Sequence, residues 1–152
     1  MINNKENLKY FWDNHLKNWS SAYNKDFKKL SILEKCAHII RTKQIENRHK
    51  FIVSLIKEKI KNKKILELGC GNGVLSKEII KMQPAHLTCI DISEIAINLT
   101  KKKLINIYDN NRIEFIIGDI ETIKIDFDKF DLILGLGISQ YLNQDIIKKI
   151  FF

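Results

Sequence analysis

Three glycines at alternate positions, Gly69, Gly71 and Gly73, separate a short apolar run from a helical pattern, and this junction constrains the fold more than any other feature. Residues 65–68 are mostly apolar, which predicts a strand buried on both faces of a parallel sheet. Residues 74–82 have helical spacing. Glycine permits positive φ and lets a ligand approach the backbone, and the free N–H groups at the start of the next helix can bind an anionic group. The junction therefore predicts a ligand-binding loop.

Strands and helices continue to alternate after this loop. Further strands are expected at residues 87–90, 113–117 and 131–134, and the helix that follows the first of them should begin at Ser93 or Glu94. Such alternation indicates βαβ units with parallel pairing and right-handed crossovers. The expected fold class is α/β, with a Rossmann-like, mostly parallel sheet that forms a domain over residues 63–152.

Residues 1–62 are expected to form an N-terminal helical extension. One helix has an aromatic face made by Leu8, Phe11, Trp12, Leu16, Trp19 and Tyr23. A second helix, capped by Asp26 or Ser31, would turn Leu30, Leu33, Ala37 and Ile40 inward, and a third would cover roughly residues 44–61. The aromatic face has two interpretations that stay open: it packs as core, or Trp12, Trp19 and Tyr23 cover a cofactor or acceptor.

Composition limits the class of protein. No stretch reaches the ~18 uninterrupted apolar residues of a membrane span. The first nine residues lack the apolar segment of a secretory signal. The three cysteines form no C-x-x-C pair, which argues against a disulfide framework or a metal site. A reduced, cytoplasmic protein is expected. Residues 1–64 hold 16 of the 26 Lys and Arg but 6 of the 18 Asp and Glu. This basic excess could attract nucleic acid, anionic lipid or an acidic substrate, although solvated surface lysines are the preferred interpretation.

The run Glu67-x-Gly69-x-Gly71-x-Gly73 resembles the first motif of class I S-adenosylmethionine-dependent methyltransferases. The resemblance implies that this loop, Cys70 included, lies against the methionine part of S-adenosylmethionine. Glu67 would hold the loop or bind the cofactor's amino group through water. The alternative, an NAD-type oxidoreductase, is disfavoured because a G-x-G-x-x-G fingerprint would require a third glycine where Val74 or Ser76 stands.

Three further motifs match the same family in the expected order. Asp91, at the end of the second strand, offers two acceptor oxygens to the ribose hydroxyls, and Ile92 would lie against adenine. Asp119 would accept from the adenine amino group, with Ile120 beside the ring. Backbone near Gly135 and Leu136 would receive the methionine part. The resemblance covers about residues 64–145 and implies the strand order 3-2-1-4. A helix cap for Asp91 and a simple turn for Asp119 are the alternatives.

Catalysis is less well indicated. Methyl transfer depends mainly on alignment and exclusion of water, and no strong general base is evident. The four histidines, His15, His38, His49 and His86, are expected to be surface or packing residues. Gln140 and Tyr141 follow the fourth strand, and Tyr141 is the catalytic candidate, with a packing aromatic as the alternative.

The acceptor is expected to be a small molecule, in the general pattern of enzymes for quinone precursors, porphyrin-like compounds or other metabolites. The N-P-P-Y or D-P-P-Y signature is absent, which argues against methylation of amino groups of nucleic acid or of protein glutamine, so a nucleic-acid partner is not expected. The chain stops after four strands, so we expect a fragment whose open sheet edge is covered by a partner chain or by self-association. A cofactor-binding or interaction module without turnover is the alternative function.

Overall fold

The computed structural model describes residues 5–23, 31–105, 107 and 112–151, and its centre is a four-stranded parallel sheet. The strands are β1 (Lys64–Leu68), β2 (His86–Asp91), β3 (Ile113–Ile117) and β4 (Leu132–Gly135). Their order is β3-β2-β1-β4, and every pairing is parallel. The α/β fold class and the predicted strand order are therefore confirmed. β2 and β3 are added on one side of β1, and β4 is added on the other, so the strand order switches direction between β1 and β4. Such switch points favour ligand sites at the carboxyl ends of the strands.

Helices connect and cover these strands. They are α3 (Val74–Lys81), α4 (Glu94–Leu104) and α5 (Gln144–Phe151), with the 3₁₀ helices η3 (Phe127–Lys129) and η4 (Ser139–Tyr141). Ser93 caps α4, because its Oγ accepts from the Ala96 N–H at 3.1 Å, and the helix therefore starts where the sequence predicts. Asn143 begins α5 in the same way, with its Oδ1 accepting from the Ile146 N–H at 2.9 Å.

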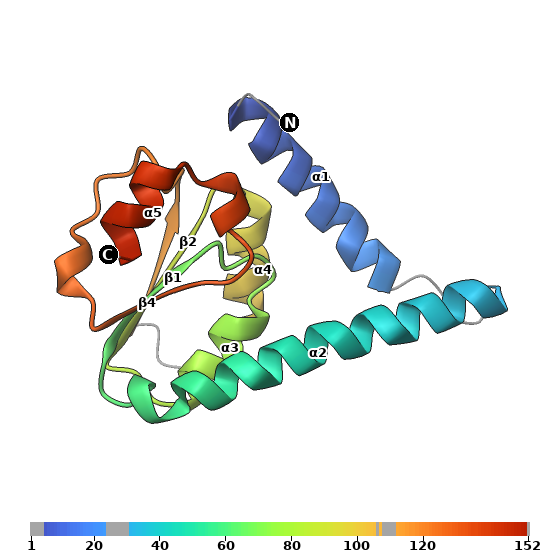
Figure 1. The fold of residues 1–152 in the computed structure, drawn as a ribbon, viewed down its shortest axis with the longest axis horizontal. Helices are drawn as coiled ribbons and strands as arrows, with labels where there is room; N and C mark the ends of the chain where they lie inside the picture. Colours follow the sequence, from blue (N-terminus) through green and yellow to red (C-terminus); the bar gives the residue numbers. More distant parts are fainter. Residues whose placement is uncertain (1–4, 24–30, 106, 108–111, 152) are drawn as a thin grey trace.

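Two apolar layers enclose the sheet, since successive strand residues alternate between its faces. On one face, β1 and β2 pack against α2, α3 and α4 through residues such as Ile60, Ile65 and Ile79, each fully buried. On the other face, Leu66 and Leu68 pack with Ile150 of α5 and with the segment after β3. Figure 1 shows this arrangement, with α5 lying apart from α2, α3 and α4.

The N-terminal region contains two described helices, not the three that the sequence predicts. They are α1 (Lys5–Tyr23) and α2 (Ile32–Ile60). Ser31 caps α2 in a capping box with Glu34, and the other predicted cap, Asp26, lies outside the described residues together with Leu30. The predicted break between residues 40 and 44 does not occur, because this segment has no glycine or proline to stop helix propagation.

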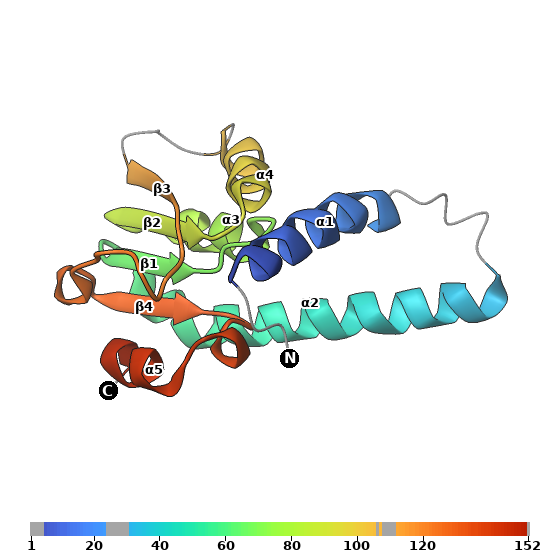
Figure 2. The same cartoon turned by 90° about the horizontal axis from the view of Figure 1, so that it is seen from above.

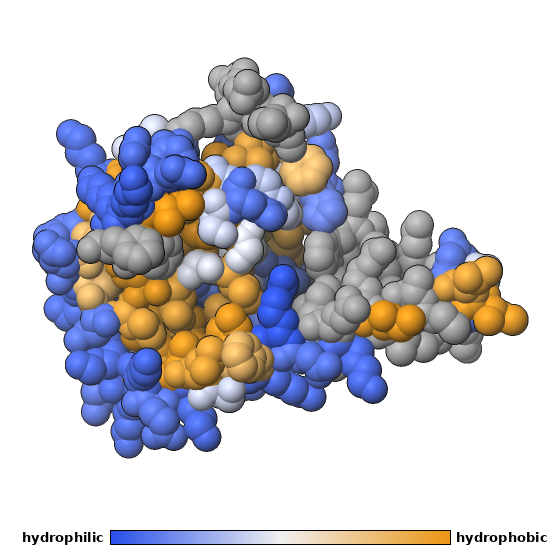
Figure 3. All heavy atoms as spheres, viewed as in Figure 1, coloured by the Kyte–Doolittle hydropathy of each residue, from blue (hydrophilic) through white to orange (hydrophobic). Residues whose placement is uncertain are grey.

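The outer part of α2 also corrects the predicted packing. Leu33 and Ile40 are 84% and 58% exposed, because this part of the helix extends beyond the sheet and its layers. The side chain of Ala37 is not described. Figure 3 shows apolar atoms at the far tip of α2 and a second apolar area over the region where Figure 1 draws β4. Among the described side chains of α2, those that pack against the core lie on its inner part and include Ile56 and Ile60.

The two ends of the sheet differ in what covers them. At the amino end, Asp131 precedes β4 and accepts from the Lys64 N–H at 2.8 Å and from Lys63 Nζ at 3.0 Å, and these bonds hold the pKa of its carboxyl below its usual value. At the carboxyl end, the arrowheads of β1, β2 and β4 point toward α1 (Figure 2). The hydroxyl of Ser93 donates to Oδ1 of Asp13 and ties α1 to the start of α4.

Two further expectations concern the whole chain. No helix in the described residues is long and apolar enough to cross a membrane. Within the same residues β4 pairs only with β1, so the predicted partner at this edge, like the predicted boundary between residues 1–62 and 63–152, stays a prediction.

Candidate functional site

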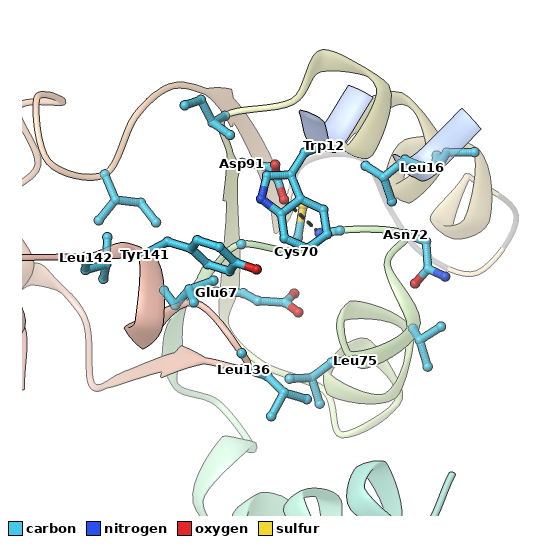
Figure 4. Close-up of a pocket in the computed structure, with 18 of the residues that line it drawn as sticks. Trp12, Leu16, Glu67, Cys70, Asn72, Leu75, Asp91, Leu136, Tyr141 and Leu142 are labelled. Carbon is cyan, nitrogen blue, oxygen red and sulfur yellow. Dashed lines mark hydrogen bonds between the residues drawn. The ribbon is translucent and has the colours of Figure 1, made fainter. Parts of the chain in front are cut away.

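A pocket of about 850 Å³ lies at the carboxyl ends of the strands. Its wall comes from β1, β2 and the segments that follow β1, β2, β3 and β4, together with residues of α1, α2, α3 and α4. Of the residues that the sequence predicts to bind the cofactor or take part in catalysis, those in the wall are Glu67, Gly69, Cys70, Gly71, Asp91, Ile92, Asp119, Ile120, Leu136 and Tyr141. Figure 4 shows Glu67 and Asp91 near Trp12 and Tyr141 in this pocket.

The three loop positions require glycine for different structural reasons. All have positive φ, which is 71° at Gly69, 57° at Gly71 and 71° at Gly73. A Cβ at Gly69 would collide with Cγ2 of Ile138, and one at Gly73 would lie 2.9 Å from the backbone of Thr100. A Cβ at Gly71 would have no heavy atom within 4 Å. Gly71 therefore leaves open space beside a pocket wall, whereas Gly73 serves close packing and is not among the lining residues.

Asp91 joins the glycine loop to the end of β2. Its Oδ2 accepts from the Gly71 N–H and its Oδ1 from the Ser93 N–H, both at 2.9 Å. Burial raises the pKa of this carboxyl, the hydrogen bonds from Ser93 and Gly71 lower it, and the nearby charge of Asp13 raises it further. Each oxygen keeps acceptor capacity toward the pocket, because a carboxylate offers about four lone-pair sites.

Glu67 is the most buried acid of the pocket, at 3% exposed. Its Oε2 accepts from Ser76 Oγ on α3 at 2.5 Å and lies 3.8 Å from Cys89 Sγ on β2. Burial raises the pKa of the Glu67 carboxyl to about 7, against the effect of these two hydrogen bonds and with a smaller rise from the charge of Asp91. The side chain thus connects β1 to α3 behind the loop, and near neutral pH it exists in both protonation states.

The wall near β3 combines an acid with apolar side chains. Asp119 Oδ1 accepts from the Glu121 N–H at 3.0 Å, which closes a turn, and the Gly118 N–H donates to the Asp91 carbonyl at 2.9 Å. Ile92 and Ile120 also line the pocket. A flat apolar ring could lie between such side chains while its polar edge meets Asp119.

An aromatic pair from distant parts of the chain lies at the same pocket. The ring of Trp12 on α1 meets the ring of Tyr141 on η4 edge to face, with centroids 5.5 Å apart and planes at 85° (Figure 4). Leu8 and Leu16 of α1 also line the pocket. Of the two interpretations of the aromatic face, the covering one therefore fits Trp12, whereas the side chains of Trp19 and Tyr23 lie outside the described residues.

Some residues differ from the sequence interpretation. Gly135 ends β4 opposite Leu68 and is not in the pocket wall, where Leu136 and Gly137 lie instead. His49, expected to be a surface or packing residue, is half-buried and lines the pocket with Arg48 and Lys103. No sequence pattern marks these residues, because their place at the pocket depends on how α2 and α4 pack in the folded protein. Among the described residues no cluster of three His, Cys, Asp or Glu could hold a metal ion.

Comparison with known proteins places these features in a family. The family described as "Methyltransferase domain" matches residues 65–151, which is more than half of the chain. A malonyl-[acyl-carrier protein] O-methyltransferase of Priestia megaterium is 38% identical over 90 residues, 57% of this chain and 31% of that protein. A ribosomal RNA small subunit methyltransferase C of Buchnera aphidicola is 35% identical over 128 residues, 80% of this chain and 36% of that protein. The chain spans about a third of the length of these curated relatives.

Solved structures share the fold at low sequence identity. A magnesium protoporphyrin IX methyltransferase of Synechocystis, solved with S-adenosylmethionine bound, superposes with a TM-score of 0.69 at 14% identity, covering 99% of this chain and 71% of that one. A putative S-adenosylmethionine-dependent methyltransferase of Methanococcus maripaludis gives a TM-score of 0.59 at 21% identity, covering 77% and 57% of the two chains.

Proposed function

The chain belongs to the methyltransferase domain family, and from that premise we propose that it binds S-adenosylmethionine in the pocket at the carboxyl end of the sheet and transfers the methyl group to a small-molecule acceptor. The observation that carries the proposal is the pairing of Gly71 with Asp91. The Asp91 carboxylate holds the loop N–H at 2.9 Å, and the missing Cβ of Gly71 leaves space for a ligand between them and the opposite wall.

The residues of the pocket fit the chemistry of this cofactor. Asp91 has spare acceptor capacity for two vicinal hydroxyls. Ile92 and Ile120 can flank adenine, and Asp119 can accept from its amino group. The acidic wall suits a ligand that carries a sulfonium and an ammonium group, because opposite charges attract more strongly away from bulk water.

We propose two roles for Glu67, one in holding the loop and one in binding the cofactor. Its bond from Ser76 supports the role of holding the loop against α3. A second role, binding the cofactor's amino group through water, remains compatible with its place in the pocket wall. Leu136 would contribute backbone on the methionine side, with Gly137 next to it.

The methyl group of the bound cofactor is already activated for transfer to a nucleophile. The chain therefore has to align the acceptor and exclude water. Trp12, Tyr141 and Leu142 provide an apolar, aromatic wall for this purpose. Tyr141 stays the catalytic candidate, as a phenol that can exchange a proton with the acceptor. The two described cysteine side chains, Cys70 and Cys89, are free thiols, which supports action in a reducing compartment such as the cytoplasm.

Calorimetric titration with S-adenosylhomocysteine and, separately, with NAD tests the cofactor. We expect the first to bind and the second not to bind. Asp91→Ala should weaken binding by at least about tenfold, or ~1.4 kcal/mol, while the control Asp126→Ala, which removes an exposed carboxylate paired with Lys129, should not. Binding of NAD alone, or equal affinities for both variants, would overturn the cofactor assignment.

The acceptor is tested with methyl-labelled cofactor and a cell extract divided by ultrafiltration. Label in the low-molecular-weight fraction is expected. Label in ribosomal RNA or protein would contradict a small-molecule acceptor. Ribosomal RNA is measured separately, because one relative is named as a ribosomal RNA methyltransferase. Intact cofactor binding without label in any fraction would indicate the alternative, a binding module without turnover.

A further inference from the structure

The long helix α2 has a second apolar face in addition to the one that packs against the core. Ile52 and Ile56 belong to the packed face. Phe51 and Leu55, which directly precede them in the chain, are 63% and 54% exposed. Because successive helical residues are about 100° apart, Phe51 and Leu55 belong to a different side of the helix. This second face points into solvent.

The exposed face continues toward the outer tip of α2. Leu33, Ile40 and Asn47 are exposed and spaced seven residues apart, and Phe51 and Leu55 follow at spacings of four. Seven residues are almost two full helical turns, so these side chains form one stripe, in which Asn47 is the polar member. The stripe is roughly 33 Å long at 1.5 Å of rise per residue. Figures 1 and 2 show that its outer half extends beyond the sheet.

Basic side chains border this stripe on both sides. Lys43, Lys50 and Lys57 repeat every seven residues and lie roughly a quarter turn from the stripe on one side. Arg48 and Lys59 lie roughly a quarter turn away on the other side. All five side chains are exposed. The stripe between its two basic rows therefore matches a partner that combines apolar material with negative charge.

The charge of the helix decides between the partners that could cover the stripe. α2 contains seven Lys and Arg but three Asp and Glu. A second copy of α2 would bring the basic rows of two chains together, which is unfavourable. Nucleic acid would neutralise the rows but leave the aliphatic side chains without a partner, because such binding depends mainly on phosphates. An anionic lipid surface suits both, since its headgroups attract lysines while apolar side chains enter the acyl boundary.

We propose that α2 binds the surface of a membrane that contains anionic lipids, with Leu33, Ile40, Phe51 and Leu55 toward the bilayer. A helix of this kind lies in the membrane interface and does not cross it, in agreement with the lack of a spanning helix among the described residues. The packed face of α2 stays on the core, so binding requires no unfolding. The inference does not depend on the proposed function.

Co-sedimentation with lipid vesicles tests the inference. The protein should bind vesicles of phosphatidylcholine and phosphatidylglycerol in equal parts at least about tenfold more tightly than vesicles of phosphatidylcholine alone. Ile40→Ser should weaken binding to the anionic vesicles by at least about fivefold, because it removes an inserted apolar side chain. Ile105→Ser is the matched control and should have no effect, since Ile105 is 64% exposed against 58% for Ile40 but lies at the end of α4.

The basic rows are tested separately. Replacing Lys43 and Lys50 together by Gln should weaken binding to the anionic vesicles by at least about tenfold. The double variant Lys102→Gln with Lys124→Gln is its control, because it removes two exposed lysines outside α2. Unchanged circular dichroism of each variant shows that the fold is retained.

Several results would overturn the inference. Equal binding to neutral and anionic vesicles would remove the role of the basic rows, and equal losses in variants and controls would remove the role of the stripe. Binding to ribosomal RNA or to an acidic peptide, weakened by Ile40→Ser and without binding to vesicles, would assign the stripe to that partner instead. Self-association that Ile40→Ser abolishes in sedimentation equilibrium, again without vesicle binding, would assign it to a second copy. Titration with S-adenosylhomocysteine tests the proposed function independently of these outcomes.

Discussion

The protonation of Glu67 offers a quantitative test of how the pocket is built. Burial raises the pKa of its carboxyl from 4.5 to about 7. Between these values the folded protein keeps a proton that the unfolded chain has released. The contribution of Glu67 to folding stability is therefore full below about pH 4.5 and is lost as the pH rises toward 7. This direction is that of a buried acid whose neutral form is favoured.

The size of the effect follows from the same two pKa values. Each pH unit between them is worth about 1.4 kcal/mol, so complete ionisation costs the folded state about 3 kcal/mol. Glu67→Gln keeps the shape of the side chain and an acceptor for Ser76 Oγ, but it cannot ionise. Relative to the parent, this variant should gain about 2.5 kcal/mol between about pH 5 and pH 8, because part of the cost is already present at pH 5.

Urea unfolding followed by circular dichroism over this pH range measures the difference. Glu58→Gln is the matched control, because the Glu58 side chain is 84% exposed and its loss reports only the removal of a carboxyl from the surface. A stability difference between parent and Glu67→Gln that stays constant with pH would refute the reasoning. A variant that loses stability relative to the parent as the pH rises would refute it more strongly, since it would require an ionised Glu67 that stabilises the fold.

Three further changes test the loop, the start of α4 and the cover. Gly69→Ala should lower the urea-unfolding free energy by more than ~2 kcal/mol, because the added Cβ would clash with Ile138. Gly71→Ala should cost only ~1 kcal/mol of backbone strain, yet its folded fraction should lose at least as much affinity for S-adenosylhomocysteine as that of Gly69→Ala. Equal stability losses for the two variants would contradict this difference. Ser93→Ala removes a helix cap and should cost ~1 kcal/mol in the same assay. Trp12→Ala separates α1 from Tyr141 and should speed limited proteolysis within α1 without moving the main unfolding transition.

The α/β part of the fold was predictable because its signals are local. The apolar run, the glycines and the following helix determine β1, the loop and α3 within about 20 residues, and Asp91 ends its strand where parallel strands carry ligand groups. Strand ends meet at one edge of the sheet once the order is known. The strand order is therefore enough to predict that residues such as Gly71, Asp91 and Asp119 lie around one pocket.

The N-terminal region was less predictable because its contacts are not local. Leu33 and Ile40 have the spacing of an inward face, yet they lie on a part of α2 that no described core reaches. Periodicity indicates that a helix has an apolar face but not whether a partner lies against it. Arg48 and His49 were missed for the same reason, since only the packing of Ile56 and Ile60 brings that turn of α2 to the pocket.

The helix α1 and the glycine loop are nevertheless connected through one chain of hydrogen bonds. Asp13 on α1 accepts from the Ser93 hydroxyl, the Ser93 N–H donates to Asp91, and Asp91 accepts from the Gly71 N–H. The charge of Asp13 also contributes to the raised pKa of Asp91. A cationic ligand that favours the ionised form of Asp91 would thus act on the hydrogen-bond partner of Ser93, the residue that holds α1 through Asp13. Because Trp12 directly precedes Asp13 in that helix, cofactor binding and the aromatic wall for the acceptor depend on the same anchoring point.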